Sequence, residues 1–172
     1  MRYAMSGTWW PERLTISDDA GTARFEVRNH PGFATMLSLS VAGGEEIATI
    51  RRRRGGRFQV IVRGEEAGLV RRRGADRYDI QNTLSSLTAE GSVTDGQYSI
   101  TCDGLAQATV SREIADHVRR TQRISVDIGG GDAVALLATV LAVEAVCYEG
   151  GSHFNPRALL DLLNPFKWWD LT

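Results

Sequence analysis

The sequence has few cysteines, almost no net charge and no apolar run long enough to cross a bilayer. Its two cysteines, Cys102 and Cys147, could form one bridge at most and belong to no CxxC pair, which disfavours a disulfide scaffold or a zinc site. A formal net charge of -1 disfavours a generally basic nucleic-acid binder. The first residues lack the apolar segment of a signal peptide, so we expect no export and a cytoplasmic location.

Motifs of catalysis and cofactor binding are missing as well. The sequence has no GxSxG elbow and no HExxH pair, and its three histidines are scattered. The glycines at 129–131 lack the Gly-Lys-Ser/Thr ending of a phosphate loop, and Asp132 after them is the N-cap expected of a helix. We therefore expect no catalytic residues, no metal and no cofactor.

What the sequence does contain is a long series of short alternating segments separated by turn signals. Its 172 residues, 42% of them hydrophobic, are enough for one domain with a single core. Apolar residues alternate in segments such as Leu37/Leu39/Val41 and Phe58/Val60/Val62, which is the period of half-buried antiparallel strands. About eleven such segments precede residue 130, and that many short strands predict a sandwich or a closed barrel.

An internal repeat supports paired hairpins within one sheet. The segment 48–60 recurs twenty residues later as 68–80, with the same internal spacing. A further copy lies forty residues from the first, where Tyr98, Ile100, Val110 and Arg112 echo Phe58, Val60, Val70 and Arg72. Each unit reads as a strand, a glycine turn and a returning strand.

After the three glycines the pattern changes to that of a helix. Residues 132–148 carry one charge within their body, Glu144, and are apolar on every face. The uninterrupted apolar stretch has eleven residues, well short of the roughly 20 needed to span a bilayer. We therefore expect the strands to close around this helix and bury it.

The residues after 149 form a separate element. Asn155-Pro156 marks a helix start, and the leucines at 159, 160, 162 and 163 predict a short amphipathic helix that Asn164-Pro165 interrupts. Phe166, Trp168 and Trp169 follow. We expect this tail to dock on the barrel, on a partner or on a second copy, and an interfacial membrane anchor is the other interpretation.

The ordered motifs resemble the LURP-one-related family, a branch of the tubby C-terminal-like superfamily that also includes the phospholipid scramblases. The resemblance covers roughly residues 8 to 148. At the end of this range a Gly-Asp turn and an apolar helix follow the motif at 124–128. It rests on the segments 37–39 (LSL), 46–52 (EIATIRR), 98–100 (YSI), 108–111 (ATVS) and 124–128 (ISVDI).

That resemblance implies a twelve-stranded barrel threaded by a hydrophobic C-terminal helix, and it implies no catalytic residues. In the tubby branch, basic surface residues hold phosphoinositide headgroups; the scramblases have a membrane and calcium role; the role of the LURP-one-related branch is largely open. The Trp-rich extension after Tyr148 departs from the family pattern, so its partner is expected to differ.

The fold prediction is therefore mainly β: a closed antiparallel barrel of about twelve strands around a central helix. The barrel domain is expected at 8–149, with its helix at 132–148, and a helical, Trp-rich extension at 150–172.

The strongest charge feature is a concentration of arginine in the two repeat copies. Ten arginines fall between residues 51 and 77, and the repeat places both runs at equivalent strand ends. They could converge into one patch that holds phosphates bidentately, or simply form a solvated barrel rim. The candidates for headgroup binding are Arg51, Arg52, Arg53, Arg54, Arg71, Arg72 and Arg73.

Two functional hypotheses remain open at this point. The leading one is a non-enzymatic binding module, peripheral to a membrane, that presents the arginine-rich rim to anionic phospholipid headgroups or an acidic protein. The alternative is a protein-interaction or homo-oligomerisation module that uses the tail. Nucleic acid is disfavoured because no aromatic residues interleave with the arginines. The candidates for partner docking in the tail are Leu159, Leu163, Phe166, Trp168 and Trp169.

Overall fold

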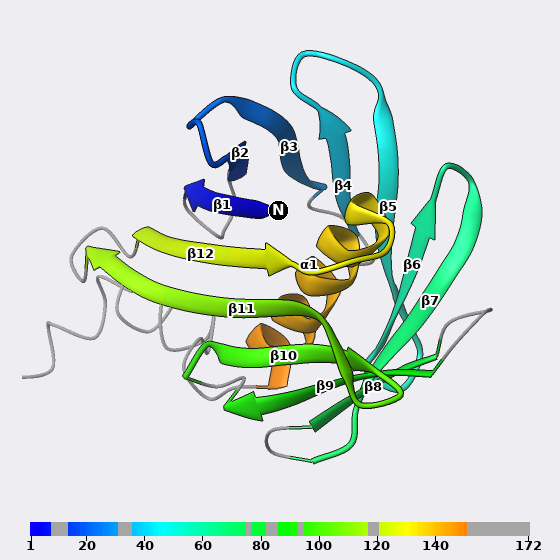
Figure 1. Cartoon of the computed structure of the whole chain (residues 1–172). Coiled ribbons are helices and arrows are strands. Elements are labelled where there is room, and N and C mark those ends of the chain that lie inside the picture. Colours follow the sequence, from blue (N-terminus) through cyan, green and yellow to red (C-terminus); the bar gives the residue numbers. More distant parts are fainter. Residues whose placement is uncertain are drawn as a thin grey trace, which may run out of the picture.

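Twelve strands and one helix make up the described part of the chain (Figure 1). The computed structural model describes residues 1–7, 14–30, 36–74, 77–81, 86–92, 95–116 and 121–150. The strands are β1 Arg2–Gly7, β2 Leu14–Asp18, β3 Ala23–His30, β4 Met36–Val41, β5 Glu46–Arg53, β6 Arg57–Val62, β7 Glu65–Arg72, β8 Arg77–Gln81, β9 Ser86–Ser92, β10 Gln97–Cys102, β11 Leu105–Asp116 and β12 Thr121–Ile128; the helix α1 is Ala133–Gly150.

The strands form one closed antiparallel barrel. Each strand pairs with its neighbours in sequence, and β1 closes the ring by pairing with both β2 and β12. This arrangement confirms the predicted fold class. It also places β1 in the barrel wall, before the boundary at residue 8 that the sequence suggested.

The repeat copies form adjacent hairpins, as their matched spacing predicted. In the hairpin of β5 and β6, Ile50 lies opposite Val60, and in the hairpin of β7 and β8, Val70 lies opposite Ile80. All four side chains are buried, because alternate residues of each strand face the barrel interior. The repeat therefore sets the register in which the apolar residues of successive hairpins meet inside.

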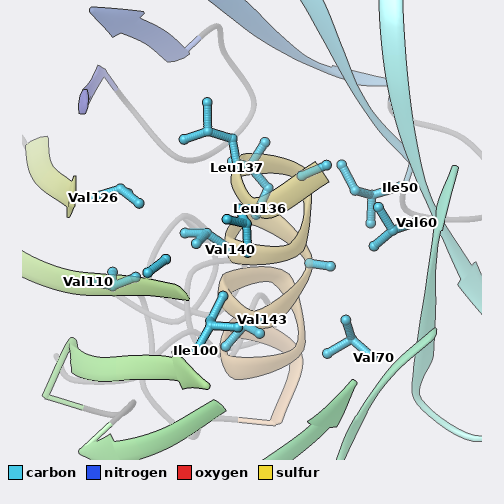
Figure 2. Packing of buried hydrophobic residues seen from close by; sticks show 14 of the residues in the cluster. Ile50, Val60, Val70, Ile100, Val110, Val126, Leu136, Leu137, Val140 and Val143 are labelled. Carbon is cyan, nitrogen blue, oxygen red and sulfur yellow. The ribbon is translucent and has the colours of Figure 1, made fainter. Parts of the chain in front are cut away.

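Helix α1 fills the barrel. From Leu137 through Glu144 every side chain is at most 5% exposed. Figure 2 shows the helix with Ile50, Val60 and Val70 on one side and Ile100, Val110 and Val126 on the other. A helix that is apolar around its whole circumference is stable only when protein surrounds it, which is why this sequence folds inside the sheet. The expectation of an enclosed helix is confirmed.

The helix begins where the sequence placed its cap. The Asp132 carboxylate accepts hydrogen bonds from the backbone N–H groups of Val134, at 2.8 Å, and Ala135, at 3.3 Å. These are donors in the first turn that have no partner within the helix. No helix in the described residues is both long and apolar enough to span a membrane.

Candidate anion-binding surface

Both arginine runs lie at the same end of the barrel, which we call the arginine end. There, strands β5 and β7 end in Arg53 and Arg72, while β6 and β8 begin at Arg57 and Arg77. The four strands are consecutive in the barrel wall, so the turns that follow β5 and β7 are near neighbours. Helix α1 begins at the opposite end, after β12, and runs toward the arginine end (Figure 1). The topology thus brings together the two runs that the sequence separates by twenty residues.

Three of these arginines stand in one row across the wall. Arg53 pairs in register with Arg57, and Arg57 pairs with Arg71 on the next strand. Residues directly opposite on neighbouring strands project from the same face and have Cβ atoms about 5 Å apart. Like charges in such positions repel one another, so this row costs folding free energy.

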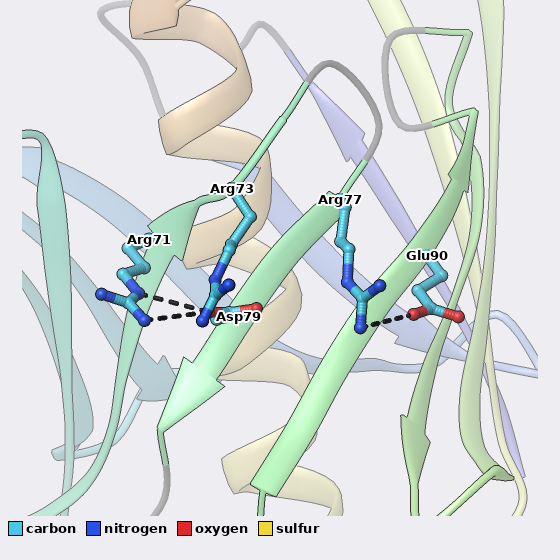
Figure 3. A network of polar contacts seen from close by, with 5 residues as sticks. All are labelled: Arg71, Arg73, Arg77, Asp79 and Glu90. Carbon is cyan, nitrogen blue, oxygen red and sulfur yellow. Dashed lines mark hydrogen bonds and ion pairs between the residues drawn. The ribbon is translucent and has the colours of Figure 1, made fainter.

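Carboxylates lie near Arg71, at one side of the row; Figure 3 shows Asp79 and Glu90 beside Arg71, Arg73 and Arg77. Asp79 lies opposite Arg71 in register and accepts hydrogen bonds from Arg71, at 3.1 Å, and Arg73, at 2.5 Å. Partial burial raises the pKa of Asp79, but the two guanidinium groups outweigh it and leave the pKa below its usual value. Arg77 forms a further ion pair with Glu90 at 3.3 Å. Arg71, Arg73 and Arg77 are therefore largely committed to acidic partners on β8 and β9.

The arginines around the β5–β6 turn have much weaker compensation. Arg53 donates to the neutral amide of Gln59, which in turn donates to the Glu66 carboxylate. Arg51, Arg54 and Arg57 form no side-chain hydrogen bond or ion pair with the rest of the described chain. The unneutralised positive charge is thus concentrated on this turn and not on the turn after β7.

A shallow hollow lies beside the same turn. Its volume is about 550 Å³, and it is lined by Arg52, Arg53, Arg54, Arg57 and Leu69. This volume is within the range of small-molecule binding sites. Four guanidinium groups and one aliphatic side chain give the hollow the chemistry to hold an anion that carries an apolar flank.

A second polar cluster lies inside the barrel, near the same end. The Glu144 carboxylate of α1 is fully buried; it accepts a hydrogen bond from the Tyr98 hydroxyl at 3.0 Å and from Arg112 at 2.9 Å. Gly96, opposite on the β9–β10 turn, makes room for Arg112, because a Cβ there would overlap the stem of that arginine. The helix is thereby tied to β10 and β11 by a buried ion pair.

Burial governs the titration of this internal cluster. Loss of solvation raises the pKa of Glu144, although the Arg112 charge and the Tyr98 hydroxyl partly oppose the rise. Burial also raises the pKa of Tyr78 to about 12 and raises the pKa of the Cys147 thiol, so both stay protonated at neutral pH. A protonated thiol is a poor nucleophile. The described residues contain no group of three or more side chains suited to a metal ion.

The sequence pattern indicated the surface arginines as candidate binding residues, but it did not indicate the internal cluster. Glu144 stood out only as the single charge in an apolar helix, and Arg112 only as the repeat equivalent of Arg72. Because Arg112 follows the inward-facing Val110 by two residues, the strand period places it on the inner face, where Glu144 would be its natural partner. The tail candidates, Leu159, Leu163, Phe166, Trp168 and Trp169, lie outside the described residues.

Comparison with known proteins places this fold in a family. A closed antiparallel barrel wrapped around an apolar helix defines the class of the protein. The chain belongs to the LURP-one-related family, whose model matches residues 4–144. Its fold is similar to the X-ray structure of a protein from Arabidopsis thaliana, with a TM-score of 0.62 and 17% identity over 84% of this chain and 91% of that one. A comparison with curated protein sequences gave no match.

Proposed function

We propose that the protein is a non-enzymatic binding module that holds anionic phospholipid headgroups at its arginine end. The observation that carries this proposal is the pair Arg53 and Arg57, which lie opposite each other in register next to a hollow with four arginines in its lining. Guanidinium groups bind phosphate oxygens bidentately, and an anion between them would relieve their mutual repulsion.

The energetics favour a ligand over a purely structural role for these side chains. Arg54 and Arg57 contribute no ion pair to the described fold, and the row of like charges opposes folding. Near an anionic membrane each basic residue contributes roughly 1 kcal/mol of attraction, which falls off within a Debye length. Several arginines on one barrel end would therefore give measurable, salt-sensitive binding.

A lipid surface fits the geometry better than an acidic polypeptide does. The charges occupy two neighbouring turns at a barrel end, and the hollow beside the β5–β6 turn is shallow and open. Such a surface meets many headgroups at once, whereas an extended peptide needs a groove or a free strand edge. In the closed barrel the described strands all have partners on both sides, so strand addition has no site there.

Co-sedimentation with vesicles tests this function. The wild type is compared with Arg53→Gln/Arg54→Gln/Arg57→Gln on vesicles of phosphatidylcholine with and without phosphatidylserine, at low and high salt. The matched control is Arg2→Gln/Arg24→Gln/Arg63→Gln, which makes the same charge change at the opposite end of the barrel. Those three arginines form exposed ion pairs with Asp127, Asp18 and Asp132, so their loss should cost little stability.

We expect the wild type and the control to bind the anionic vesicles alike, and the arginine-end variant to bind at least about tenfold more weakly. Failure of the wild type to bind at low salt would refute the proposal. Equal binding to polyglutamate and to anionic vesicles would point to an acidic protein partner. A molar mass that falls when residues 151–172 are removed, without lipid binding, would instead support the oligomerisation module.

A further inference from the structure

The two ends of the barrel carry opposite charge. In an antiparallel barrel successive turns alternate between the two ends, so each turn of the chain can be assigned to one of them. The turns after β2, β4, β6, β10 and β12 lie at the end where α1 begins, which we call the acidic end. The turns after β5, β7 and β9 lie at the arginine end.

The imbalance is large at both ends. Among described turns and the two outermost residues of each strand, the acidic end has nine carboxylates against three arginines, an excess of six. By the same criterion the arginine end has eight arginines against two carboxylates, Asp95 and Asp116, while Asp79 and Glu90 lie one residue deeper. The carboxylates of the acidic end are Asp18, Asp19, Glu45, Glu46, Glu65, Glu66, Asp103, Asp127 and Asp132.

Most of these charges are separated by more than the screening length; Glu66 is the exception, because Gln59 links its carboxylate to Arg53. The helix that connects the two ends has 18 residues, which at 1.5 Å per residue is about 27 Å. The Debye length at physiological ionic strength is only about 8 Å. When the arginine end touches an anionic surface, the acidic end is therefore screened from it. If the barrel lay on its side, carboxylates of the acidic end such as Glu65 would come within range of the same surface and be repelled.

Resting on the proposed function, we propose that the barrel docks end-on. The turns after β5 and β7 contact the anionic lipid, and the acidic end faces away from the membrane into solvent. The charge pattern thus fixes the orientation of the module, as well as its attraction to the surface. Arg63, the one arginine of the 51–77 stretch that lies at the acidic end, is paired with Asp132 at 3.7 Å and takes no part in the contact.

Site-specific fluorescence can measure this orientation. Gly74→Cys reports from the arginine end, where a Cβ meets no atom within 4 Å, and Ala20→Cys reports from the exposed β2–β3 turn at the acidic end. Both are made with Cys102→Ser, and a Cys102→Ser protein without a new cysteine corrects for labelling of the half-buried Cys147. Energy transfer from the label to an acceptor lipid in phosphatidylserine vesicles is then compared at the two sites.

End-on docking predicts transfer at least twofold more efficient from position 74 than from position 20, with both signals lost at high salt. Equal transfer from the two sites, or stronger transfer from position 20, in a protein that still co-sediments with the vesicles would overturn the orientation but leave the lipid-binding function intact. No transfer from either site, together with no co-sedimentation, would overturn both.

Discussion

At the scale of single residues, the pairing of Glu144 with Arg112 has the largest expected effect on stability. The carboxylate is fully buried, and the arginine side chain is only 11% exposed. Water therefore screens this pair far less than it screens the ion pairs on the outer wall. Removing one member leaves the other buried, charged and without compensation.

A double-mutant cycle measures this dependence. We expect Glu144→Leu alone to lower the free energy of unfolding by about 3–5 kcal/mol, because it leaves the guanidinium of Arg112 and the hydroxyl of Tyr98 without their acceptor. Glu144→Leu with Arg112→Leu should recover a large part of that loss. Urea denaturation of the wild type, Glu144→Leu, Arg112→Leu and the double variant gives the coupling, and additive losses would show that the pair does not act as a unit.

The same carboxylate should leave a mark on the pH dependence of stability. The pKa of Glu144 is raised above the ordinary value of 4.5. At a pH between 4.5 and the raised pKa, the folded state therefore holds a proton that the unfolded state has released. The contribution of Glu144 is therefore fully present below pH 4.5 and is lost as the pH rises to the raised pKa.

Glu144→Gln removes this titration and serves as the comparison. The unfolding free energy of the wild type relative to Glu144→Gln should fall as the pH rises from 4.5, and then become constant. Urea unfolding at a series of pH values for both proteins measures the difference. A difference that stays constant, or that grows in favour of the wild type, would mean that Arg112 dominates over burial and that the pKa is not raised.

At the scale of elements, the helix and the strands depend on each other. The helix needs the barrel because it is apolar on all faces, and the inward-facing side chains of the strands need the helix to fill the interior. A single charge placed anywhere along its middle turns should therefore be buried without a partner.

Arginine substitutions at positions 135 to 138 test this enclosure. Leu137→Arg and Ala138→Arg replace fully buried side chains, and we expect neither protein to fold to a soluble form. Ala135, which is only partly buried in the first turn, should accept arginine at a smaller cost. Thermal melting of the four variants decides, and wild-type melting of Leu137→Arg or Ala138→Arg would rule out a helix enclosed by the barrel.

Much of the element-level structure could be read from the sequence, because it depends on local periodicity. The alternation in the segments around Phe58 and Val60 follows from the strand pleat, and the repeat fixed which hairpins are equivalent. The strand before residue 8 was not recognised, since a segment such as Arg2–Gly7 joins the barrel through long-range pairing with β12. The ion pairs of the arginines, such as that of Arg71 with Asp79, also depend on cross-strand register, so no local sequence pattern indicates them.

At the scale of the whole molecule, the barrel has two oppositely charged ends, although the sequence has almost no net charge. The formal net charge of -1 does not reveal this separation, because the charges of acidic and basic turns along the chain cancel when they are added. The antiparallel order of the strands separates them, since every second turn falls at the same end. The functional proposal follows from this sorting and not from composition.

Lipid binding by the arginine end is tested most directly by the affinity of the full-length wild-type protein for vesicles as their phosphatidylserine fraction and the salt concentration are varied. We expect binding that rises steeply with the anionic fraction at low salt, weakens progressively as salt is added, and is absent on pure phosphatidylcholine. Binding that does not depend on the anionic fraction, or no binding to phosphatidylserine-rich vesicles at low salt, would contradict it.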